Sequence, residues 1–123
     1  MAHRALSCLV FAAVLWCAGT ESARANAFLH HASPAVGSTV HTSPSTVRLK
    51  YTEELKPTYS RARVEDASGA VVSTAAAHID EYERSVLIVL VGALKPGRYK
   101  VIWNVLSVDT HMTRGTFDFA VAP

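Results

Sequence analysis

The chain has 123 residues, of which 50% are hydrophobic and 18% are charged, and its formal net charge is +2 at pH 7. This length fits one domain of ordinary size, and no run of basic residues indicates nucleic acid or an anionic membrane surface as a partner. Once residues 1–27 are set aside, ten Lys or Arg stand against nine Asp or Glu, so the remainder is close to neutral.

The first 27 residues have the features of a secretory signal peptide. Arg4 gives a positively charged start, and the apolar run over residues 5–18 is shorter than the roughly 20 residues that span a bilayer. Two overlapping A-x-A cleavage sites follow, which leave cleavage after Ala25 and cleavage after Ala27 both open. We therefore predict a signal peptide over residues 1–27, an exported domain over residues 28–123, and no membrane insertion of the mature chain.

Both cysteines, Cys8 and Cys17, lie in the predicted signal peptide. The mature domain therefore has no disulfide and no thiolate metal site, although it is exported. An apolar core alone must hold it together.

The mature part shows short strand-like segments separated by turn signals. Residues 47–51 and 60–65 alternate between apolar and polar side chains, and residues 85–91 form an apolar run typical of a strand covered on both faces. Residues 95–98 have proline and glycine where a type II turn requires them. Alternation returns in residues 99–105 and 117–121.

The stretch from residue 74 to residue 84 has no clear apolar stripe, so we predict a loop with at most a helical turn. About seven short strands with turns every 8–12 residues then indicate an all-β fold. The prediction is a single Greek-key β-sandwich or small barrel.

Asp109-Thr110-His111 lies between two alternating segments. In an extended crossing, a carboxylate and an imidazole two residues apart project to the same side. Together they can offer an oxygen and a nitrogen to one metal ion, and Cu(II) accepts mixed nitrogen and oxygen ligands. The alternative is an ordinary loop in which Asp109 caps backbone amides and His111 is solvated.

Three blocks of the chain resemble the CopC-type copper resistance proteins. Residues 28–38 are similar to the start of the mature family sequence, and residues 49–55 resemble its Leu-x-Phe-Ser-Glu-x-Leu strand end. Residues 94–119, which include the Asp-x-His segment, are similar to its C-terminal half. The resemblance covers essentially the whole mature chain.

The resemblance implies a periplasmic Cu(II) carrier or buffer in copper homeostasis and resistance, without enzymatic activity, on a cupredoxin-like or immunoglobulin-like barrel. Its ligands would be the amine and imidazole of the first residue, Asp109 and His111, and in some members Glu53. A companion CopD-type copper transporter of the inner membrane is the implied partner. With Met1 and Met112 as its only methionines, the chain lacks the soft ligands of a Cu(I) site.

The N-terminus departs from the family pattern, because Asn26 stands where the first histidine is expected. Cleavage after Ala25 would leave an amine without an imidazole. Cleavage after Ala27 would instead place His30 third in the mature chain. The amine, two backbone amides and the His30 imidazole could then wrap Cu(II) in a square plane, with proton release and weaker binding on acidification.

Two other classes of function stay open at this point. An immunoglobulin-like interaction module that has lost tight metal binding is favoured by the missing first histidine and opposed by Asp109 and His111. A copper oxidoreductase with an N-terminal histidine brace requires histidine as the first mature residue, and neither cleavage site supplies it.

Overall fold

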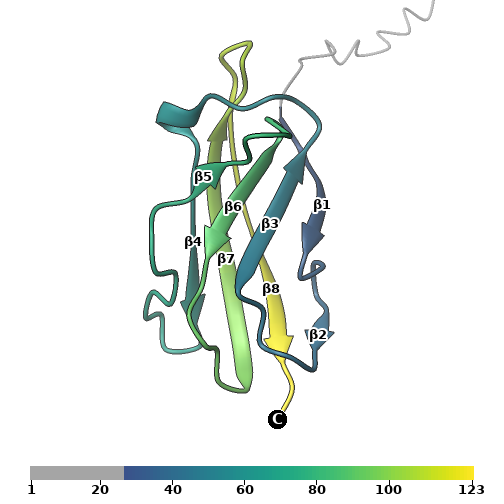
Figure 1. The fold of residues 1–123 in the computed structure, drawn as a ribbon, viewed down its shortest axis with the longest axis vertical. Coiled ribbons are helices and arrows are strands. Elements are labelled where there is room, and N and C mark those ends of the chain that lie inside the picture. Colours follow the sequence, from purple (N-terminus) through teal and green to yellow (C-terminus); the bar gives the residue numbers. More distant parts are fainter. Residues whose placement is uncertain (1–26) are drawn as a thin grey trace, which may run out of the picture.

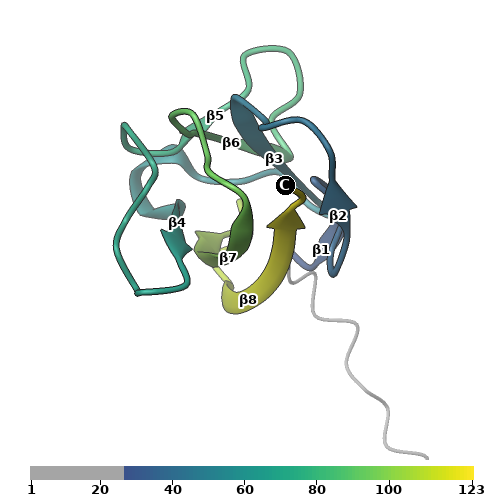
Figure 2. The ribbon, with the colours of Figure 1, turned by 90° about the horizontal axis from the view of Figure 1, so that it is seen from below.

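The computed structural model describes residues 27–123; the predicted signal peptide up to Asn26 lies outside the described residues. The described part contains eight strands and one 3-10 turn: β1 (Leu29–Ser33), β2 (Thr39–Val40), β3 (Thr46–Tyr51), η1 (Pro57–Tyr59), β4 (Arg61–Asp66), β5 (His78–Ile79), β6 (Val86–Leu90), β7 (Gly97–Leu106) and β8 (Met112–Val121). They form two four-stranded sheets, ordered β1-β3-β6-β5 and β2-β8-β7-β4. Figure 1 shows the sheets face on, and Figure 2 shows them from one end.

The alternation of apolar residues explains how the two sheets pack. Every second residue of β3 and of β7 is buried, and these side chains meet between the layers. Tyr51 of β3 packs edge-on against Trp103 of β7 with ring centroids 5.2 Å apart, and Tyr99 stacks on Phe119 at 5.5 Å. Burial of these aromatic rings contributes much of the core stabilisation, and the predicted all-β sandwich is confirmed.

The hairpin of β7 and β8 is the longest feature of the fold. Ten residues of each strand pair without interruption, from Gly97 opposite Val121 to Leu106 opposite Met112. The turn that joins the strands therefore lies at the end of a long, regular ribbon, well away from the C-terminus (Figure 1). A regular scaffold of this kind can hold side chains of the turn in a fixed geometry.

Three local predictions differ from the structure. The outer face of β6 is covered only at the start of the strand, since Val86 is buried, Ile88 is half-buried and Leu90 is 38% exposed. Residues 74–84 contain the short strand β5 rather than a helical turn. Gly97 has a φ of 152° and already begins β7, so it does not adopt the φ near 80° of a type II turn.

No helix in residues 27–123 is long and apolar enough to cross a membrane.

Candidate metal site

Three segments that are distant in sequence meet near the β7–β8 turn. The Thr113 hydroxyl donates a hydrogen bond of 2.6 Å to the Ala27 carbonyl. The Phe28 amide donates to the Thr52 hydroxyl at 3.0 Å, and the Val108 amide donates to the Glu54 carbonyl at 3.0 Å. The start of the described chain, the segment after β3 and the turn therefore form one end of the molecule.

The β7–β8 connection runs from Ser107 to His111 and contains a tight turn over Val108–Thr110. The Thr110 amide donates to the Ser107 carbonyl at 2.9 Å, and the Ser107 amide donates to the His111 carbonyl at 3.0 Å. Thr110 has a φ of 73°, in the left-handed region that β-branched residues rarely adopt. The predicted extended crossing is therefore wrong, because hydrogen bonds across the hairpin force the chain to reverse here.

This turn brings Asp109 and His111 together by another route. Asp109 Oδ1 lies 3.6 Å from His111 Nδ1, and the two side chains are 36% and 43% exposed. This separation exceeds that of a hydrogen bond, and within residues 27–123 the buried His111 Nδ1 has no hydrogen-bond partner. Metal bonds of about 2.0–2.1 Å place two neighbouring ligand atoms roughly 3 to 3.4 Å apart. The pair therefore fits two ligands of one ion after a small adjustment.

Hydrogen bonding keeps the Asp109 carboxylate ionised. The Ser107 hydroxyl donates to Asp109 Oδ1, and this bond lowers the pKa of the Asp109 carboxyl below its usual value, with a further contribution from the neighbouring His111. A hydrogen bond to the charged form favours that form. Because metal ligands must be deprotonated, Asp109 is in the required state at neutral pH.

Neither Glu53 nor His30, the other predicted ligands, joins this pair in a cluster of three potential ligands within residues 27–123. Glu53 is half-buried. It lies beside the turn, because the carbonyl of the adjacent Glu54 accepts the Val108 amide. His30 is exposed, at an irregularity where β1 shifts its register against β3. In residues 27–123, no three His, Cys, Asp or Glu side chains lie close enough together to hold a metal ion. Asp109 and His111 are thus two donors that need further ligands.

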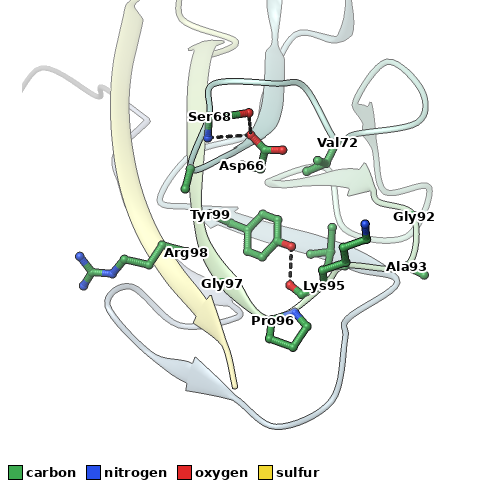
Figure 3. Close-up of a pocket in the computed structure, with 12 residues that line it drawn as sticks. Asp66, Ser68, Val72, Gly92, Ala93, Lys95, Pro96, Gly97, Arg98 and Tyr99 are labelled. Atoms are coloured by element: carbon green, nitrogen blue, oxygen red, sulfur yellow. Dashed lines mark hydrogen bonds between the residues drawn. The ribbon is translucent and has the colours of Figure 1, made fainter. Parts of the chain in front are cut away.

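A hollow of about 530 Å³ lies at the start of β7, at the opposite end of that strand from the turn. Figure 3 shows Tyr99 donating to the Lys95 carbonyl and Asp66 bonded to Ser68. Asp66 is the one carboxylate of the lining, and its Oδ1 also accepts the Ala70 amide. With no histidine in the lining and its carboxylate oxygen engaged in a turn, this hollow is no metal site.

The sequence analysis missed two residues that build this end of the molecule. Ala27 is fully buried in the hydrophobic core, and Thr113 of β8 binds its carbonyl. A signal for Thr113 was available, because it falls on the inward face of an alternating strand, where a hydroxyl requires a partner. Nothing in the sequence pattern identifies Ala27 as that partner.

The strained turn gives a first prediction. Thr110→Gly should raise the free energy of unfolding by about 0.5–1 kcal/mol, because glycine adopts a positive φ without the steric cost that an L-residue carries there. Denaturant unfolding of both proteins measures this difference. Thr58→Gly, an exposed change within η1, is the control and should not stabilise. A variant at position 110 less stable than the wild type would contradict the strain.

Comparison with known proteins places the chain among copper-related sequences. Residues 29–122 match the CopC domain family. Protein YobA of Escherichia coli K12 is 36% identical over 103 residues, covering 83% of each chain. Copper resistance protein C of Xanthomonas campestris pv. juglandis is 32% identical over 111 residues, covering 80% of this chain and 85% of its own.

Solved structures show the same fold. The crystal structure of CopC from Methylosinus trichosporium OB3b aligns with a TM-score of 0.74 at 32% identity, over 80% of this chain and 95% of that one. PcoC, a methionine-rich copper resistance protein from Escherichia coli, aligns with a TM-score of 0.70 at 23% identity, over 79% and 99% of the two chains.

Proposed function

The chain belongs to the CopC family, and on that premise we propose that it is a copper-binding protein of copper resistance that carries or buffers Cu(II) in the periplasm. The observation that carries the proposal is the pairing of Asp109 Oδ1 with His111 Nδ1 at 3.6 Å. A carboxylate and an imidazole suit Cu(II) rather than Cu(I). Because this pair is retained, an interaction module without metal is the weaker account.

We propose that the mature chain begins at Asn26, after cleavage behind Ala25. Ala27 is fully buried and its carbonyl accepts the Thr113 hydroxyl, so cleavage after Ala27 would remove a residue from the core. With Asn26 first, the new amine is one residue from Ala27. The Ala27 carbonyl is hydrogen-bonded to Thr113, which is two residues from His111. The amine is then a suitable third ligand, although the imidazole of a first histidine is missing.

A copper site wrapped around the N-terminal tail is less compatible with the fold. It would need the deprotonated amides of Leu29 and His30, with Phe28 as the first residue. Leu29 instead belongs to β1 and pairs with Tyr51, while the Phe28 carbonyl accepts the Thr52 amide at 2.9 Å. Wrapping the metal would detach the start of β1, so we assign His30 a secondary role at most.

Glu53 is proposed as an auxiliary ligand. It lies between Thr52, which bonds Phe28, and Glu54, which bonds Val108. Its backbone is thus held beside the turn, and a side-chain rotation could bring the carboxylate toward a bound ion. The chain supplies a matched control in Glu54, the exposed neighbour.

The ligand set can be tested by removing one charge at a time. Asp109→Asn should weaken Cu(II) binding by about tenfold or more, because loss of an outer-sphere partner alone costs about 10- to 100-fold and an amide oxygen is a poorer ligand for Cu(II) than a carboxylate. Glu53→Gln should cause a smaller loss, and Glu54→Gln should leave the dissociation constant unchanged. Competition against a chelator of known affinity measures all three. Unchanged binding by Asp109→Asn would remove Asp109 from the site.

For the partner, we propose transfer of copper to a CopD-type transporter of the inner membrane, without catalysis by this protein. Two large hydrophobic side chains flank the ligand pair, Val108 at 47% and Met112 at 49% exposure. Exposed apolar residues next to a site can contact a partner while the ion is exchanged.

A further inference from the structure

Two serines, Ser60 and Ser107, are the buried polar residues of the described part of the chain. Ser107 contacts both proposed ligands. It follows the last residue of β7, is 0% exposed, and forms an isolated bridge with Leu55. Its hydroxyl donates to Asp109 Oδ1 and accepts the His111 amide at 3.3 Å. The same oxygen lies 3.3 Å from the His111 carbonyl.

The hydroxyl of Ser68 also donates to an aspartate two residues away, but Ser107 differs from it in being buried and in contacting His111 as well. A serine hydroxyl has a single proton to donate. The ionised Asp109 carboxylate is a stronger acceptor than the His111 carbonyl, so the proton goes to Asp109. The hydroxyl thus holds the carboxylate from one side. The Ser107 amide also donates to the His111 carbonyl, and the Ser107 carbonyl accepts the Thr110 amide.

We propose that Ser107 is a positioning residue, whose hydroxyl fixes the Asp109 carboxylate beside His111 Nδ1 before copper arrives. The inference rests on the proposed copper function of this pair. Groups that orient metal ligands from the outer sphere change metal affinity by about 10- to 100-fold when they are removed. Without Ser107 the Asp109 side chain would sample several rotamers, and copper binding would have to select one of them.

Ser60 provides a matched control. It is 4% exposed, and its hydroxyl accepts the Leu106 amide at 3.2 Å and contacts the Leu106 carbonyl at 3.4 Å. It is therefore a second buried serine bonded to the end of β7, one residue before Ser107, without contact to either ligand.

The test compares Ser107→Ala with Ser60→Ala. We expect Ser107→Ala to raise the dissociation constant for Cu(II) by about 10- to 100-fold and to broaden or shift the EPR spectrum of the bound ion. Ser60→Ala should lower stability while leaving affinity and spectrum as in the wild type. Ser107→Thr, which keeps the hydroxyl, should restore most of the affinity. Wild-type affinity and spectrum in Ser107→Ala would overturn the proposal.

A metal-free readout separates this inference from the copper function itself. Three-bond couplings measured by NMR should show one χ1 rotamer for Asp109 in the wild type and averaging in Ser107→Ala. Averaged couplings in the wild type would overturn the positioning role, even if Ser107→Ala does not fold. If the wild type shows one rotamer but does not bind Cu(II), the proposed function fails while the tether between Ser107 and Asp109 stands.

Discussion

His111→Ala is expected to weaken Cu(II) binding by more than about 100-fold. Loss of an outer-sphere partner already costs about 10- to 100-fold, and His111 supplies the one imidazole that the structure places beside Asp109. Its ring is held at the end of the β7–β8 ribbon, and residues 27–123 contain no cluster of three His, Cys, Asp or Glu side chains that could bind the ion in its place. Chelator competition or calorimetry measures the change.

The control for this variant is His78→Ala. His78 is exposed on β5, an edge strand of the other sheet, so an imidazole is removed from outside the β7–β8 hairpin. Copper affinity should stay at the wild-type value. If His111→Ala instead binds as tightly as the wild type, Asp109 and His111 are not the copper site, and the N-terminal tail with His30 becomes the better candidate.

Gly115→Ala is expected to lower the free energy of unfolding by about 1–3 kcal/mol, the usual range for overpacking a core. Gly115 pairs with Trp103 across the two long strands. A Cβ atom on Gly115 would lie 2.5 Å from Cζ2 and 2.8 Å from Cε2 of the Trp103 indole. The indole is 8% exposed and packs against Tyr51, so it has little room to move aside.

Gly92→Ala is the matched control for this packing effect. A Cβ atom there would meet Thr74 Cγ2 at 3.6 Å, an ordinary contact. Urea unfolding should show a change in stability at position 115 several times larger than at position 92. Equal stabilities of the two variants would show that the indole yields easily, and that glycine is not required opposite Trp103.

Much of the architecture was predictable, because alternating side chains determine which face of a strand is buried. β3, β4, β7 and β8 all fall within or around the segments assigned from alternation. The shorter strands β1, β2 and β5 escaped assignment, since two to five residues carry too little periodicity. β1 and β2 also depend on pairing with strands that do not follow them directly in the sequence. The coverage of β6 was overestimated because an apolar run does not reveal how many layers pack on a strand.

The site was only partly predictable. Asp109 and His111 were predicted as ligands from residue type and spacing. The reason they lie close together is the turn at Thr110, whose positive φ is not expected of threonine. The roles of Ser107 and Ala27 depend on contacts across the turn and between chain segments 86 residues apart. Hydrogen bonds of this kind arise from tertiary structure, and no local pattern encodes them.

The central claim is that one Cu(II) ion binds at Asp109 and His111 together with the N-terminal amine. An EPR-monitored titration of the protein purified after natural export tests it most directly, with the mature N-terminus read by mass spectrometry. We expect a chain that starts at Asn26 and a single tight type-2 signal, saturating at one equivalent, with couplings from two nitrogens. Weak, heterogeneous signals, or a four-nitrogen spectrum from a chain that starts at Phe28, would contradict the account.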